Sequence, residues 1–90
     1  MDHFVRVADI PAAEFGDELA VMDLKSGAYL TFNRTAAELW SLLEVPRPLE
    51  ALVRELAARY PAVEPDRCRS EVEALLAQLV GMGVVERRGG

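Results

Sequence analysis

The chain is short of the residue types from which catalytic and metal sites are built. Its 90 residues include one cysteine, Cys68, and one histidine, His3. A single thiol excludes an intrachain disulfide and a zinc site made of cysteines. His3 stands in a terminus that we expect to fray, and Cys68 lies at helical spacing from Val72, which is typical of a core residue. We therefore expect no catalytic residue, no cofactor and no metal ion, and predict that the chain is not an enzyme.

Motifs for phosphate binding, membrane insertion and export are also missing. Gly16 and Gly27 are isolated, and no serine stands in a Gly-x-Ser-x-Gly motif, which excludes a phosphate-cradling loop and a nucleophile elbow. The apolar runs are too short to cross a bilayer, so we expect no membrane partner. The first residues lack the basic and apolar regions of a signal peptide. Together with the lone cysteine, this favours a cytoplasmic location.

Basic residues are outnumbered in this chain. Fifteen acidic residues against ten basic ones give a formal net charge of −5. A nucleic-acid-binding surface needs clustered Lys and Arg to neutralise phosphates, so we expect no nucleic-acid partner. An acidic surface is compatible with a basic or neutral peptide, and it also serves solubility alone.

Apolar sequence, in contrast, is plentiful. Half of the chain, 51%, is hydrophobic, which suffices for the core of one domain, and we predict a single domain over residues 1–90. The first third has the alternation of strands, which we expect at 4–7, 18–24 and 28–32. The last two should form a hairpin with positive φ at Gly27, and the first should pair beside the second.

Helical spacing dominates the remaining two thirds. Thr35–Glu38 has the pattern of a capping box, and the helix that it opens places Trp40 toward the core. Pro48 and Pro65 suit the first positions of a second and a third helix. Gly83 suits the end of the third helix, before a short closing strand at 84–86. This order predicts an α+β, winged-helix-like fold with a three-stranded antiparallel sheet followed by three helices.

The third helix has an apolar arc of roughly 160°, wider than a single core contact needs. Either the arc contacts two sides of the core, or one of its edges is left for a ligand. Both interpretations stay open for Val72, Leu76 and Val80, whereas the core is favoured for Leu75 and Leu79. The arc consists of Cys68, Val72, Leu75, Leu76, Leu79, Val80 and Met82.

A winged-helix DNA-binding regulator is an alternative from another functional class. Its last helix would enter the major groove and present basic or amide side chains to the bases. Here the polar face of the third helix mixes acids and bases, so phosphates would repel its carboxylates. That face carries Asp66, Arg67, Arg69, Ser70, Glu71, Glu73 and Gln78.

The run from Val21 to Trp40 resembles the signature of the PqqD-like family. That signature is a hydrophobic strand, a Ser/Thr-Gly turn, an aromatic strand, and a helix with an Ile/Leu-Trp pair. Later segments extend the resemblance to about residues 18–86, although Ala28 stands where the family often has arginine. The matching residues are Gly27, Tyr29, Asn33, Ala36 and Trp40.

The resemblance implies a RiPP recognition element, a module that binds the leader segment of a ribosomally synthesised precursor peptide and presents it to modifying enzymes. The Ser-Gly-x-Tyr and Leu-Trp features favour the lasso-peptide type, whose partners are a leader peptidase and a cyclase. The alternative is a PqqD-type chaperone that delivers a precursor peptide to a radical-SAM enzyme.

In this family the leader adds as a strand beside the third strand, along the third helix. A free strand edge and apolar pockets are what such strand addition requires. The predicted peptide-binding residues are therefore Ala28, Tyr29, Leu30, Thr31, Phe32, Arg69, Val72, Glu73, Leu76 and Val80.

Overall fold

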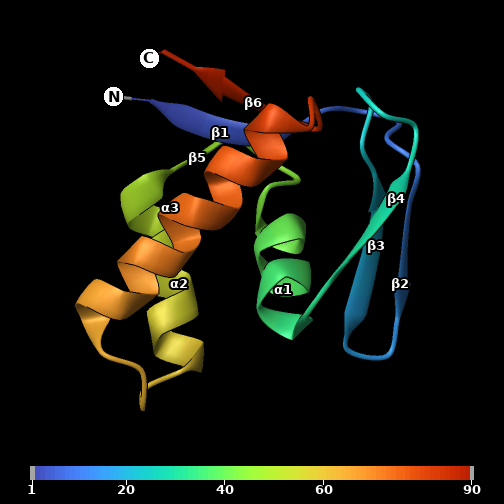
Figure 1. Ribbon diagram of the computed structural model, residues 1–90. Helices are drawn as coiled ribbons and strands as arrows, with labels where there is room; N and C mark the ends of the chain where they lie inside the picture. The colour runs from blue at the N-terminus through green and yellow to red at the C-terminus, as the bar shows by residue number, and fades with distance from the viewer. Residues whose placement is uncertain (1, 90) are drawn as a thin grey trace.

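The computed structural model of the chain describes residues 2–89 and has the predicted α+β architecture, with three helices and two small antiparallel sheets (Figure 1). One sheet has the strand order β2-β3-β4, and the other has the order β5-β1-β6. The strands are β1 (His3–Arg6), β2 (Ala12–Phe15), β3 (Glu18–Met22), β4 (Tyr29–Phe32), β5 (Arg47–Pro48) and β6 (Val85–Arg88); the helices are α1 (Arg34–Leu42), α2 (Leu49–Arg59) and α3 (Pro65–Gly81).

The β3–β4 hairpin confirms the strongest strand prediction. Leu19 and Val21 of β3 are fully buried, and the strand alternates between its two faces as the sequence indicates. The turn closes where the N–H of Gly27 donates to the carbonyl of Asp23 at 2.8 Å. Gly27 has a φ of +77°, a conformation that glycine adopts without a steric penalty.

The predicted place of the first strand is wrong. β1 does not pair beside β3, because β2 occupies that position. β1 pairs instead with β5 and with β6, the closing strand that the sequence predicts at 84–86. The sequence prediction missed β2 because all four of its residues are exposed, so this segment lacks the alternation of apolar and polar residues from which a strand is predicted.

The predicted capping box is also wrong by two residues. The cap of α1 is Asn33, whose Oδ1 accepts a hydrogen bond from the N–H of Ala36 at 3.1 Å. Asn33 is extended and follows β4 directly, so the chain enters the helix before Thr35 is reached. Glu38 forms ion pairs with Arg34 and Arg59 instead of capping the helix.

The ends of α2 and α3 lie near their predicted positions. Pro48 caps α2 instead of occupying its first turn, and Pro65 opens α3. Gly83, with a φ of +81°, ends the last turn in a Schellman motif. Its N–H donates to the carbonyl of Val80 at 3.0 Å, and the N–H of Val84 donates to that of Leu79 at 3.2 Å.

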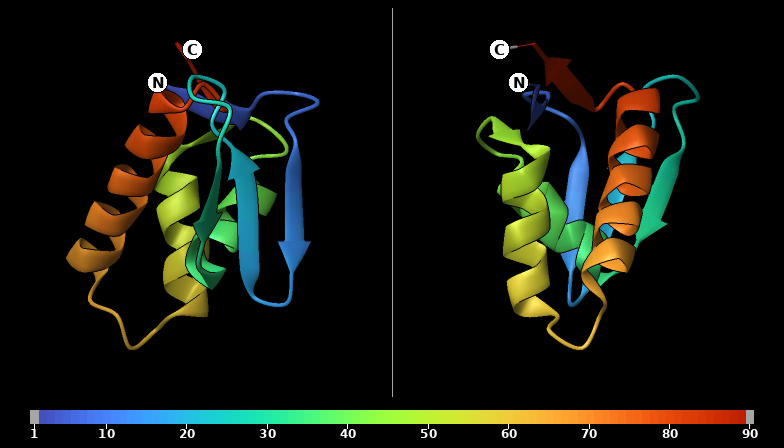
Figure 2. Two further views of the ribbon diagram at one scale, coloured as in Figure 1. Left: turned by 45° about the vertical axis from the view of Figure 1, so that its right-hand side comes forward. Right: turned by 90° about the vertical axis from the view of Figure 1, so that its left-hand side faces the viewer.

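A single core connects the helices to the β2-β3-β4 sheet and to β1 and β6. Trp40 belongs to it with 4% of its surface exposed, which confirms its predicted core position. In Figure 1, α1 lies between α3 and β4, and in the left view of Figure 2 it lies behind β3 and β4. Within residues 2–89, no helix has the length and apolar character that a bilayer crossing demands.

Candidate functional site

β4 is an edge strand, because within residues 2–89 its only neighbour in the sheet is β3. The N–H of Asp23 donates to the carbonyl of Ala28 at 2.8 Å, so Asp23 and Ala28 are a hydrogen-bonded pair. The register then shows which of the following β3–β4 pairs are hydrogen-bonded. Bonded and non-bonded pairs alternate along an antiparallel ladder. Leu30 and Phe32 therefore direct their backbone groups to β3, whereas Tyr29 and Thr31 direct theirs outward.

The side chains of β4 alternate between the two faces of the sheet. Leu30 and Phe32 are half-buried and pack against the core. Tyr29, with 56% of its surface exposed, and Thr31 lie on the outer face. A strand added at this edge would bond to Tyr29 and Thr31, and every second side chain would join the row of Leu30 and Phe32.

One flank of α3 is turned toward β4. At its start, Glu71 lines a cavity of about 60 Å³ together with Thr35, which follows β4 in the chain. At its end, the carbonyl of Met82 accepts a hydrogen bond from the N–H of Leu24, in the β3–β4 turn, at 3.2 Å. Leu75 and Gln78 lie between these positions, since residues 71, 75, 78 and 82 fall within about 60° around a helix.

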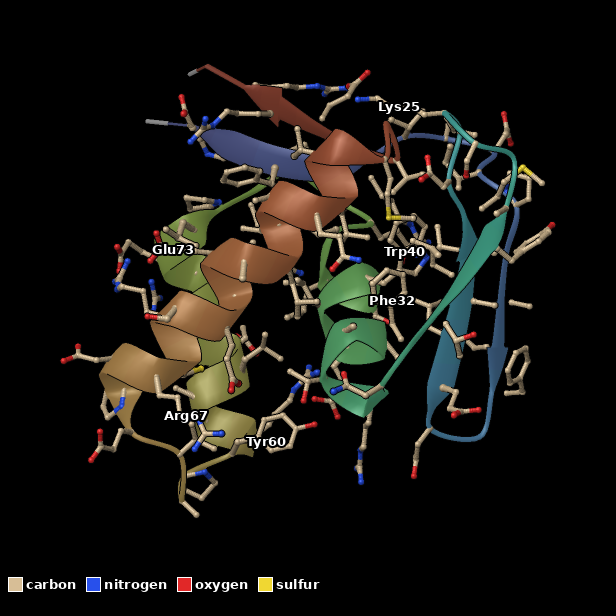
Figure 3. The ribbon with its side chains drawn as sticks, in the orientation of Figure 1. Lys25, Phe32, Trp40, Tyr60, Arg67 and Glu73 are labelled. Carbon is tan, nitrogen blue, oxygen red and sulfur yellow. The ribbon has the colours of Figure 1, made fainter. Side chains whose placement is uncertain are left out.

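The structure turns four of the five predicted α3 residues away from β4, which corrects the predicted geometry; the fifth, Val72, lines the same small cavity as Thr35. Arg69 forms an ion pair with Glu50 of α2. Glu73, Leu76 and Val80 lie on the side of α3 that is roughly opposite to the flank that faces β4. Figure 3 shows Glu73 on the α2 side of α3 and Phe32 on the β4 side. The three residues line a 410 Å³ pocket together with Phe4, Leu49, Ala77, Gly81 and Arg87.

Two of the predicted contact residues are parts of the core. Val72 and Leu76 are only 1% and 3% exposed, so each offers almost none of its surface to a ligand in this conformation. Leu75, which the sequence interpretation assigned to the core, is the half-buried leucine on the flank toward β4. The arc of α3 does have a free edge, but helical periodicity alone does not tell which edge faces β4.

Charges around this region are mostly exposed and paired. Arg69 holds the pKa of the Glu50 carboxyl below its ordinary value, chiefly by donating a hydrogen bond to it. Arg67 and Glu71 form a further pair one turn apart, with 3.2 Å between Nε and Oε1. Within residues 2–89, no group of three or more His, Cys, Asp or Glu side chains is arranged to hold a metal ion.

Three comparisons with known proteins bear on this arrangement. The model of the family "Coenzyme PQQ synthesis protein D (PqqD)" matches residues 18–85. A comparison with curated proteins gives no match. A solved structure described as "TbiB1 in Complex with the TbiA(beta) Leader Peptide" is similar, with a TM-score of 0.78 and 22% sequence identity; the match covers 96% of this chain and 99% of that one. At this identity, the similarity shows a fold shared over almost the whole of both chains.

Proposed function

The chain belongs to the PqqD family, and from this membership we propose that it binds the leader segment of a ribosomally synthesised precursor peptide and presents it to modifying enzymes. The lasso-peptide type, with a leader peptidase and a cyclase as partner enzymes, is favoured by the Ser26-Gly27-Ala28-Tyr29 turn and the Leu39-Trp40 pair. Delivery of a precursor to a radical-SAM enzyme is the alternative within the same family.

The free edge of β4 is the observation that carries this proposal. Tyr29 and Thr31 turn two N–H and two C=O groups away from β3, and an extended peptide satisfies such groups by adding a strand. TbiB1, whose fold is similar, was solved in complex with a leader peptide, which supports leader binding by this fold.

The flank of α3 toward β4 supplies the side-chain contacts of the proposed complex. A leader residue opposite Leu30 would point to the core side of the sheet, because directly opposed residues share a face. There it would meet Leu75, the apolar residue of this flank. In this arrangement the leader contacts Glu71, Leu75 and Gln78, and the predicted residues Arg69, Glu73 and Val80 lie behind α3.

A DNA-binding function fits this surface poorly. The net charge is −5, and α3 exposes Asp66, Glu71 and Glu73 on its polar face. Arg67 and Arg69 of the same helix do not compensate for these carboxylates, since they are already paired with Glu71 and Glu50. Duplex DNA is therefore the negative control of the binding experiment.

Two proline variants on opposite edges of the same sheet test the proposal. Thr31→Pro removes an outward N–H of β4 and leaves the bonds to β3 in place, because proline is tolerated at such edge positions. Glu14→Pro does the same on β2. The probe is a labelled synthetic leader peptide, taken from a precursor gene to be sought near the gene of this chain, and it is titrated by fluorescence anisotropy.

We expect Thr31→Pro to weaken leader binding about tenfold or more, since a lost hydrogen bond leaves a peptide carbonyl unpaired. Glu14→Pro should bind the leader as the unchanged protein does. Equal affinities for the two variants, with both folded by circular dichroism, would refute the β4 site. Salt-sensitive micromolar binding to random duplex DNA, or leader cleavage by the repurified chain alone, would refute the proposed function.

A further inference from the structure

The sheet has a second free edge, on β2. The N–H of Met22 donates to the carbonyl of Pro11 at 3.0 Å, which makes this pair a bonded one. By the alternation of an antiparallel ladder, Ala13 then bonds to Ala20, and the backbone groups of Ala12 and Glu14 point away from β3. Both edges of the sheet therefore offer two residues with outward N–H and C=O groups.

A long hollow follows the edge of β2 on the side that faces α1. One part has a volume of 680 Å³ and lies between the segment that joins β1 to β2 and the end of α1. A second part, of 390 Å³, extends to the β2–β3 turn. Glu14 and Ser41 line both parts, so the two parts adjoin along the strand.

The hollow has an excess of unpaired negative charge. Asp9, Glu14 and Glu44 line its larger part. In the part of the chain that the structure describes, no ion pair reaches these three carboxylates. The one arginine of this part, Arg6, already donates to the Trp40 carbonyl at 3.3 Å and lies over the Trp40 ring.

The smaller part of the hollow does not compensate for this charge. Its two arginines, Arg34 and Arg59, both pair with Glu38, at 3.4 Å and 3.7 Å. Asp17 lines the same part and forms no ion pair within residues 2–89. The whole hollow therefore attracts cations.

The side chains of β2 make its two faces chemically different. Glu14 lies opposite Leu19 and so shares the face that is turned toward α1. An inward-pointing charge on an edge strand repels apolar strands, but it favours a strand with a cation opposite to it. Phe15, on the other face, is 53% exposed and offers an apolar contact to the alternate residues.

We propose that β2 is a second strand-addition surface, which binds an extended segment of a partner protein in which basic residues alternate with apolar ones. The basic side chains face Glu14, Glu44 and Asp9, and the apolar ones pack beside Phe15. This surface goes beyond the proposed leader binding and lies on the opposite edge from it, so the sheet holds the leader on β4 and the partner segment on β2 at the same time.

The test uses a synthetic peptide of about ten residues with alternating Lys and Val, capped at both ends, and a Glu-Val peptide as its counterpart. Amide chemical shifts of the ¹⁵N-labelled protein report where each peptide binds. We expect the Lys-Val peptide to shift Ala12 and Glu14, and the Glu-Val peptide to shift neither. The probe requires no leader, so its result is independent of the proposed function.

Charge reversal separates a specific surface from general attraction. The double variant Glu14→Lys, Glu44→Lys should bind the Lys-Val peptide about tenfold more weakly, since the cross-strand contact with Glu14 and the charge contact with Glu44 both become repulsive. The control, Glu55→Lys with Glu64→Lys, has the same net charge and should keep its affinity. Equal losses in both double variants, similar binding of the Glu-Val peptide, or shifts centred on Tyr29 and Thr31 would overturn the proposal.

Discussion

The guanidinium of Arg6 lies over the ring of Trp40, with 5.2 Å between Cζ and the ring centroid, and its Nη1 donates to the carbonyl of the same residue at 3.3 Å. β1 and the end of α1 are thereby joined twice, by a cation–π contact and by a hydrogen bond. The N–H of Arg6 adds a third link, since it donates to the carbonyl of Leu43 at 2.9 Å.

Trp40→Ala should destabilise the fold severely. Trp40 is 4% exposed within the core, and truncation of a buried tryptophan costs about 3–5 kcal/mol in the free energy of unfolding. Urea denaturation followed by circular dichroism measures this loss, and Trp40→Phe should lose clearly less. A folded Trp40→Ala variant with an unchanged urea midpoint would contradict the packing of α1.

The same substitution should have opposite effects at two glycines near the end of α3. Gly83→Ala should destabilise by about 1–2 kcal/mol, because its φ of +81° disfavours any Cβ. The new methyl would only touch Leu24 at ordinary contact distance, so the cost lies in the backbone. Gly81→Ala, with open space around its Cβ, should stabilise the helix by about 0.5–1 kcal/mol. Melting temperatures that move in the same direction would contradict the Schellman motif.

The ion pair between Glu50 and Arg69 should make stability depend on pH. The hydrogen bond from Arg69 lowers the pKa of Glu50 from its ordinary value of 4.5. A carboxyl with a lowered pKa in the folded state stabilises the protein above its unfolded pKa, and this contribution is lost as the pH falls through the folded value. The stability difference between the unchanged protein and Glu50→Gln should therefore be present at pH 7 and shrink below pH 4.5.

Salt provides the control for this pair. Both side chains are exposed, so 1 M salt at pH 7 should screen the interaction and reduce the same difference. Glu55→Gln, on the same helix but in no ion pair within residues 2–89, should show neither dependence. Urea midpoints at pH 7 and pH 3 measure both effects, and a difference that does not change with pH would refute the assignment.

Neighbouring leucines of α3 should respond differently to a charge. Leu76→Glu places a carboxylate at a 3% exposed core position, and the desolvation should unfold the protein. Leu76, which the sequence predicted to bind the peptide, therefore cannot serve as a probe of peptide binding. Leu75→Glu, at a half-buried position, should fold and weaken leader binding about tenfold, because binding would desolvate the charge.

Circular dichroism and a leader titration distinguish the two leucine variants. Leu75→Gln removes the charge while it keeps a side chain of similar length, so it should bind more tightly than Leu75→Glu. A folded Leu75→Glu variant with full leader affinity would place the leader on another surface.

The sequence predicted elements with a buried face and missed elements without one. β3 and β4 alternate, and the helices repeat their apolar residues every third or fourth position, so their places followed from local pattern. β2 is exposed throughout and has no such pattern. The pairing of β1 with β6 joins residues from opposite ends of the chain, which local periodicity cannot show.

For a similar reason, the sequence indicated the strand of the candidate site but not the flank of the helix that faces it. The β4 edge followed from the hairpin and from the family resemblance. Which edge of the α3 arc faces β4 depends on how α3 is rotated about its own axis. That rotation is fixed by long-range contacts, such as the hydrogen bond between Leu24 and Met82. Helical periodicity gives the position of the apolar arc on α3 but does not indicate which edge of the arc faces β4.

The pairing of β1 with β6 also sets the order in which the chain can fold. Val5 must wait for its partner Glu86, which the ribosome adds after every helix has been made. The β3–β4 hairpin and α1 join neighbouring segments and can form much earlier, since closing a short loop costs less entropy than closing a long one. During synthesis, the sheet that carries β4 can therefore be complete while β1 has only the two residues of β5 as a partner, and β6 joins the β5-β1-β6 sheet after all the other strands have been made.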